Sequence, residues 1–231
     1  MMKKGGSAWI PLAISLVGVI YVAVFLLRLG PTSPASGGVL VWAVFSVMCL
    51  LGAVATLFPH RCSSSVSVPS DLDESRYTML MGIRLVHGHH PGCGKFGGHE
   101  LVLNGKTFCA GCTGLFAGAI AALSTATLYF IFDYRPPALA GYVGLGFVVL
   151  GLLYNILLKE GPPFVRTALN FLFVLGFALI LVAVDGVGDP GLDLFAIGLC
   201  TYWMFTRIQL SRWSHDRICG ACDEDCDRKS A

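Results

Sequence analysis

Long apolar stretches alternate with short polar segments along this chain of 231 residues. Apolar windows long enough to cross about 30 Å of hydrocarbon occupy residues 9–29, 39–58, 113–132, 138–158 and 164–184. A sixth window, 192–210, is weaker because Asp193 lies at one end and Arg207 lies near the other. No small-residue cleavage site follows the first window, which we interpret as a retained helix. The pattern predicts an all-α polytopic membrane protein with about six transmembrane helices.

The polar segments divide the chain into four parts. Residues 1–58 hold the first two spans, 59–112 form a long loop, 113–210 hold the remaining spans, and 211–231 form a cysteine-rich tail. The loop is the longest polar segment and contains most of the candidate chemistry.

Two elements are predicted within the loop. From Ser70 to about His87, apolar residues recur at roughly helical spacing, which predicts a short helix lying on the membrane surface. Further on, Glu100–Leu103 and Lys106–Cys109 flank an Asn-Gly pair. Asn-Gly tolerates the positive φ angles of a two-residue turn, so this stretch predicts a β-hairpin.

Composition supports lipid as the main surrounding medium. Charged residues make up only 13% of the chain, about half of the roughly 25% typical of soluble domains. The net charge of +2 lacks the strong basic excess that nucleic-acid binding requires. We therefore expect the lipid bilayer as a partner, with a cytoplasmic protein or a second copy of the chain as further possibilities.

The distribution of basic residues predicts the orientation of the chain. With the N-terminus inside, six spans leave only Arg28 and Arg135 outside, so fourteen of the sixteen Lys and Arg residues lie inside. Both termini, the loop and the tail then lie on the cytoplasmic side of the cell membrane. Disulfides rarely persist in the cytoplasm, so the clustered cysteines more plausibly bind metal or carry out transient redox chemistry.

The loop has the ligand spacing of a zinc ribbon. His90-x2-Cys93 and Cys109-x2-Cys112 are separated by fifteen residues that include the predicted hairpin. Each short turn can direct two ligands at one ion, and the hairpin brings the second pair back to face the first. We predict a closed tetrahedral zinc site formed by these four residues.

The tail offers a second set of ligands. His215, Cys219, Cys222 and Cys226 form either a separate zinc site or a site shared with the loop that holds the tail against it. An iron–sulfur cluster is a less favoured alternative, because the flanking residues match no common iron–sulfur pattern.

Three histidines are not needed by a closed site: His87, His89 and His99. If the zinc were open to water, these residues would be weak candidates for acid–base catalysis. Glu100 is the only nearby carboxylate placed as a general base. We favour a structural role for all three histidines.

The start of the third span resembles a family of uncharacterised prokaryotic multi-pass membrane proteins. Their hallmark is a Cys-x-Arg-Cys-Thr-Gly segment that leads into a membrane helix, and Cys109, Cys112, Thr113 and Gly114 match it. Cys93 matches an upstream cysteine, but Gly111 replaces the arginine and Gly94 replaces a histidine that follows the upstream cysteine. The resemblance implies a similar topology and important thiols, and it implies no reaction.

Together these features predict an integral membrane protein that binds zinc through cytoplasmic Cys/His clusters, with a structural or partner-docking role for the metal. The alternatives are a membrane-embedded zinc enzyme with an open site, a metal transporter or sensor, and thiol redox chemistry at the Cys-x2-Cys pairs.

Overall fold

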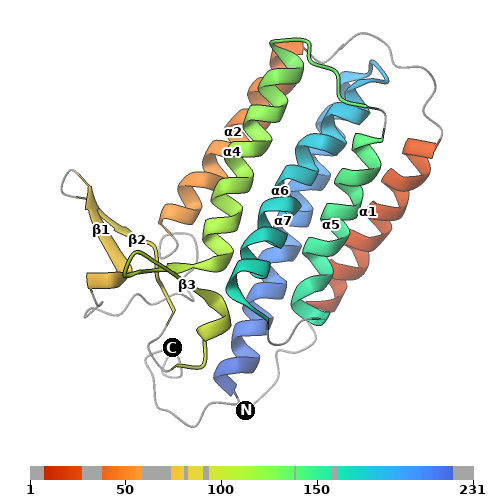
Figure 1. Ribbon diagram of the computed structural model, residues 1–231. Coiled ribbons are helices and arrows are strands. Elements are labelled where there is room, and N and C mark those ends of the chain that lie inside the picture. Colours follow the sequence, from red (N-terminus) through yellow and green to blue (C-terminus); the bar gives the residue numbers. More distant parts are fainter. Residues whose placement is uncertain are drawn as a thin grey trace.

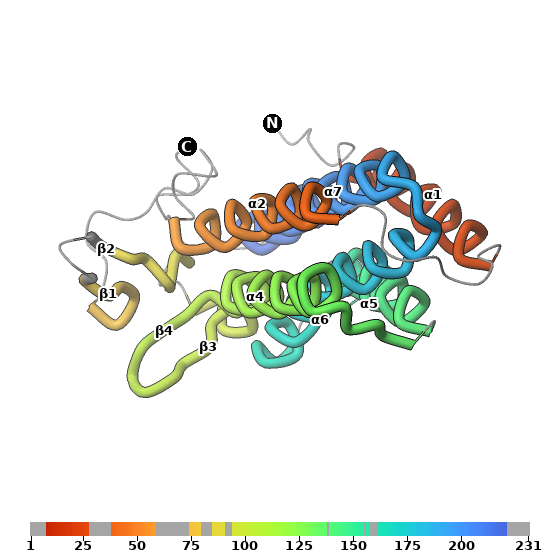
Figure 2. The backbone as a smooth tube through the Cα atoms, turned by 90° about the horizontal axis from the view of Figure 1, so that it is seen from above, coloured from red at the N-terminus to blue at the C-terminus, as the bar shows by residue number. Residues whose placement is uncertain are grey.

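A computed structural model describes residues 8–27, 38–58, 74–80, 83–90, 94–137, 139–157 and 161–220. This part of the chain is mostly helical (Figure 1). Its long helices are α1 (Trp9–Leu27), α2 (Gly38–Leu57), α4 (Ala110–Phe130), α5 (Ala140–Leu157), α6 (Pro163–Asp185) and α7 (Pro190–Gly220). Figure 2 shows them in two layers, with α1, α2 and α7 in one layer and α4, α5 and α6 in the other.

Within the described residues, four helices are long and apolar enough to cross a membrane: α1, α2, α4 and α6. The apolar part of α5 is shorter, and α7 is not among the four. Large apolar side chains of α1 and α2 are mostly exposed, for example Ile10 and Leu51, which are both 66% exposed. Such continuous apolar surfaces are unusual in water and are compatible with contact to a lipid bilayer. That α5 and α7 also cross the membrane, which would give six spans, stays a prediction.

Glycines bring α6 close to its neighbours α4 and α5. A Cβ atom on Gly114 of α4 would overlap the carbonyl oxygen of Thr167 on α6, and one on Gly118 would lie 2.8 Å from the carbonyl oxygen of Phe171. On α5, a Cβ atom on Gly144 would lie 2.8 Å from the carbonyl oxygen of Gly176. Small residues at these contacts allow the helix backbones to approach closely.

The first and last helices meet at the end of the bundle that carries the hairpins. The indole rings of Trp9, at the start of α1, and Trp213, near the end of α7, lie 5.7 Å apart. Within the same turns of α7, the ring of His215 lies 5.0 Å from that of His99 in the loop. The start of α1, the loop and the end of α7 therefore share one end of the bundle, as an even number of spans requires.

The predicted Asn-Gly hairpin is confirmed with its expected boundaries. Strands β3 (Glu100–Leu103) and β4 (Lys106–Cys109) pair antiparallel, with Glu100 opposite Cys109. Asn104 and Gly105 form the turn with φ angles of 50° and 75°, the positive values that this turn needs.

The helix predicted on the membrane surface is wrong for the described residues of that segment. After a 3₁₀ turn (Glu74–Arg76), strands β1 (Tyr77–Leu80) and β2 (Ile83–Val86) form a second antiparallel hairpin; residues 70–73 lie outside the described residues. Tertiary pairing decides the conformation: the backbone N–H of His87 donates to Arg76 (3.1 Å), and His87 accepts from the N–H of Cys109 at the end of β4 (2.6 Å). The aromatic and β-branched residues of this segment also favour strands, so helix-like spacing was a misleading signal.

The close packing of α4 on α6 makes a testable prediction. Replacing Gly114 with alanine places a methyl group against the Thr167 backbone, which cannot move without shifting α6. We expect this overpacking to lower the free energy of unfolding by about 1–3 kcal/mol, measured by denaturation in detergent micelles. The control is Gly146→Ala on α5, where no atom lies within 4 Å of the added Cβ. Equal stability of the two variants would contradict the close contact.

Candidate metal centre

Two groups of potential metal ligands lie at the hairpin end of the bundle. One contains His89, His90 and Cys109, and the other contains His90, His99 and His215. Within each group the ligand atoms lie within 4.8 Å of one another. His90 belongs to both groups, so the ligands form one continuous cluster.

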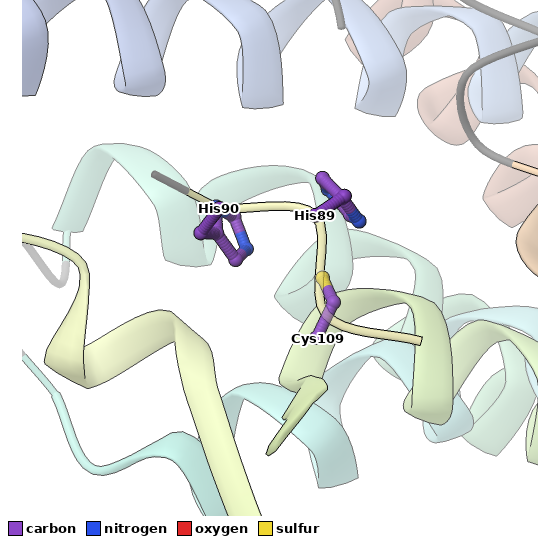
Figure 3. A group of neighbouring side chains, drawn as sticks. All are labelled: His89, His90 and Cys109. Atoms are coloured by element: carbon purple, nitrogen blue, oxygen red, sulfur yellow. The ribbon is translucent and has the colours of Figure 1, made fainter. Parts of the chain in front are cut away.

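Local structure delivers these side chains from separate segments. His89 and His90 lie just beyond the end of β2, Cys109 is the last residue of β4, and His99 ends a 3₁₀ turn (Gly97–His99) just before β3. Figure 3 shows the Cys109 sulfur pointing toward the segment that carries His89 and His90. His215 comes from the last turns of α7, so the cluster joins the loop to the C-terminal helix.

His90 is the central residue of the cluster. Its side chain is only 2% exposed, and neither ring nitrogen has a hydrogen-bond partner among the described residues. Its ring stacks on Phe96 and also contacts the rings of His99 and His215, with centroids 5.1–5.4 Å away. Buried polar groups are nearly always hydrogen-bonded. A metal ion is one partner that would satisfy a buried imidazole of this kind.

His99 is prepared to act as a neutral ligand. Burial, reinforced by the positive charge of Arg166 and by His90, lowers the pKa of the His99 imidazole to about 3. At neutral pH the ring is therefore uncharged, which is the form that binds a metal.

Cys109 is prepared to act as a thiolate. A hydrogen bond from the Cys112 thiol is the main cause that holds the pKa of Cys109 well below its usual value, against the opposing effect of burial, with His89 and His90 contributing. The backbone N–H of Cys112, in the first turn of α4, also lies 3.5 Å from the Cys109 sulfur. A helix N-terminus stabilises negative charge, and the thiolate is the form of cysteine that binds metals.

Arg76 holds the backbone of the cluster in place. Its Nη1 donates to the His90 carbonyl oxygen (2.8 Å) and to Glu100 Oε1 (2.7 Å), which links the 3₁₀ turn before β1 to the ligand segment and to β3. Glu100, the one carboxylate considered as a general base, is thus engaged in an ion pair. Its position supports a role in orientation.

His87 lies outside both groups and joins the two hairpins. Its Nδ1 lies 2.8 Å from the Thr107 carbonyl oxygen and must donate, because a carbonyl can only accept. Its Nε2 lies 3.2 Å from the Thr78 hydroxyl, which itself accepts from Lys106 and so can donate to the ring. The His87 ring also stacks on Phe108. These contacts support a structural role for His87.

The structure brings together some of the predicted ligands and adds others. His90, Cys109 and His215 lie in the cluster, whereas Cys112 and Cys219 belong to neither group. Cys93, Cys222 and Cys226 lie outside the described residues. His89 and His99, which a ribbon-type site leaves over, are members of the groups. Their only signal in the sequence was the density of histidines in the loop, because pairwise spacing does not reveal which residues meet across the fold.

A cavity of about 310 Å³ extends from the cluster into the helix bundle. His90, His99, Cys109 and His215 line it together with apolar residues of α2, α4, α6 and α7. The ligands thus border an internal space as well as the loop. No family model, curated protein or solved structure matches the chain.

The role of Arg76 is testable without knowledge of the metal. Replacing Arg76 with methionine removes charged hydrogen bonds, each typically worth about 1.5–3 kcal/mol, and leaves Glu100 without its ion-pair partner. We expect backbone amides of β1–β4 to exchange hydrogen about tenfold faster or more. The control is Arg135→Met, which removes an exposed ion pair to Asp133 away from the cluster. Unchanged exchange in the Arg76 variant would show that this residue does not position the cluster.

Proposed function

We propose that this protein is a multi-pass protein of a prokaryotic cytoplasmic membrane, and that it binds zinc at the cluster that joins the loop to α7. The observation that carries the proposal is His90, a buried imidazole with no hydrogen-bond partner among the described residues that belongs to both ligand groups. Leaving such a group unsatisfied costs about 1–3 kcal/mol, a cost that coordination to a metal removes.

The metal acts mainly as a fastener in this proposal. His90 and His99 belong to the loop and His215 belongs to the end of α7, so one ion bound by all three holds the loop on the helix bundle. A mixed set of imidazoles and a thiolate suits zinc. The candidates for additional ligands are Cys93, Cys112, Cys219, Cys222 and Cys226. The surface of the loop, once the metal holds it on the bundle, is a candidate docking site for a cytoplasmic partner or a second copy of the chain.

Charge distribution supports the proposed orientation. Among the described residues, Arg76, Arg166 and Arg212 belong to the hairpin end together with most other Lys and Arg residues, whereas Arg135 belongs to the opposite end. Lys and Arg are enriched on the cytoplasmic side of membrane proteins, so we place the cluster and both termini in the cytoplasm, with α5 and α7 as two further spans. The reducing cytoplasm would keep Cys109 available as a ligand. The motif at Cys109–Gly114 supports a prokaryotic source.

Metal analysis tests the binding proposal. We expect purified protein to contain zinc in a fixed ratio, and His90→Ala to lose it after dialysis because both ligand groups lose a shared member. The matched control is His87→Gln in the same segment, which should keep its zinc since His87 belongs to neither group. Metal-free wild-type protein, or a His90 variant with full metal content, would refute the proposal.

Limited proteolysis tests the fastening role. Chelation of the metal should expose the loop and accelerate cleavage between residues 83 and 109. His215→Ala should be cleaved quickly with or without chelator, because the helix contributes its ligand through this residue. If chelation removes the metal and leaves the cleavage rate unchanged, the metal has another role.

The second candidate function is a metal-dependent enzyme, with transport or sensing of a metal as related possibilities. The observation that favours it is the position of the ligands on the wall of a cavity, where a three-ligand ion would keep a position open for water or substrate. In cobalt-substituted protein, an open site should change its visible spectrum when azide is added. An unresponsive spectrum would support the closed, structural site.

A further inference from the structure

The cavity next to the cluster lies between the two helix layers. Residues of α2 and α7 line it together with residues of α4 and α6, and these two pairs of helices lie in different layers of the bundle in Figure 2. Away from the cluster the wall is apolar and includes Met48, Leu115, Val174, Phe177 and Met204. Its volume of about 310 Å³ is within the range of small-molecule sites.

One end of the cavity carries a buried positive charge. Arg207 lines the cavity and is only 4% exposed. Its guanidinium donates to Asn170 Oδ1 at 2.7 and 3.1 Å and to the Tyr154 hydroxyl, which are both neutral groups. No carboxylate pairs with Arg207 in the described part of the chain. Burial of a charge is costly unless a counter-ion compensates it.

The same network has more donors than acceptors. The Tyr154 oxygen accepts from Arg207 and from Asn170 Nδ2 (3.1 Å), while Asn170 Nδ2 also donates to the Arg166 carbonyl oxygen. No hydrogen bond donated by the Tyr154 O–H is found among the described residues. Tyr154 lines the cavity as well. A ligand that binds beside these residues would therefore be favoured if it brings a hydrogen-bond acceptor and a negative charge.

We propose that the cavity binds a single acyl chain with an anionic head group, with the head beside Arg207 and Tyr154 and the chain along the apolar wall. Arg166 and Arg212 line the same end, and no Asp or Glu is found among the described residues that line the cavity. A neutral lipid would leave Arg207 uncompensated, and a free inorganic anion would leave the apolar wall unfilled. This site goes beyond the proposed zinc site and does not depend on it.

Direct binding measurements test the ligand class. Protein purified in neutral detergent is titrated with labelled palmitate, 1-palmitoyl lysophosphatidate and hexadecan-1-ol. We expect at least one anionic lipid to bind once per chain and about tenfold or more tightly than the alcohol. The tighter of the two anions identifies the head as a carboxylate or a phosphate. The proposal would be overturned if hexadecan-1-ol bound as tightly as the anionic lipids. It would also be overturned if inorganic phosphate by itself displaced the bound anionic lipid.

A cavity-filling variant tests the location. Gly52 of α2 lines the cavity, and no atom lies within 4 Å of a Cβ added there, so Gly52→Leu projects a side chain into space that the acyl chain would use. We expect it to weaken lipid binding about tenfold or more. Gly146→Leu on the exposed face of α5 is the matched control, since its Cβ also meets no atom within 4 Å and it does not line the cavity. Full lipid binding by Gly52→Leu would overturn the location.

Arg207→Gln tests the charge. Glutamine retains hydrogen-bonding groups without the positive charge, so the preference for palmitate over hexadecan-1-ol should fall toward unity. An unchanged preference would show that Arg207 does not bind the head. Zinc content is measured on every sample, so that loss of lipid binding with retained zinc separates this site from the metal proposal.

Discussion

The arrangement of the loop depends on burying the His90 imidazole where the hairpins meet α7. His90 stacks on Phe96, contacts the rings of His99 and His215, and has its carbonyl oxygen held by Arg76. An imidazole buried without a hydrogen-bond partner among the described residues opposes folding unless another interaction compensates it. In our proposal a zinc ion provides that interaction, and the same bonds that satisfy His90 fasten the loop to the bundle.

In our proposal, two features prepare this end of the bundle for a metal before any ion binds. Burial and the charge of Arg166 keep His99 neutral, and the Cys112 thiol and the start of α4 favour the Cys109 thiolate. Both effects place the ligand in its metal-binding protonation state. Both effects arise from residues that are neighbours only in the folded protein. In our proposal, the affinity of the site for metal therefore depends on correct packing of α4 and α6 against the loop.

The cavity extends from the cluster of potential ligands into the helix bundle. α6 packs tightly on α4 and α5 through glycines, whereas the space between α2, α4, α6 and α7 remains open and apolar. Arg207 lies at the boundary between this space and the cluster, held by Tyr154 and Asn170. In our proposals, the apolar cavity would hold the acyl chain of an anionic lipid. Arg207, next to the loop that the metal fastens, would bind the head group.

The sequence by itself determined the features that depend on near neighbours in the chain. The apolar windows predicted the helices, and Asn104-Gly105 predicted β3–β4 with its boundaries, because helix length and turn geometry are local properties. Tertiary structure decided that β1 and β2 form a hairpin: the two strands pair with each other, and His87, just after β2, accepts from the Cys109 N–H at the end of β4. It also decided that His89, His99 and His215 converge on His90 and that Arg207 borders a cavity, because these contacts join segments far apart in the chain and follow from how α7 packs against the loop.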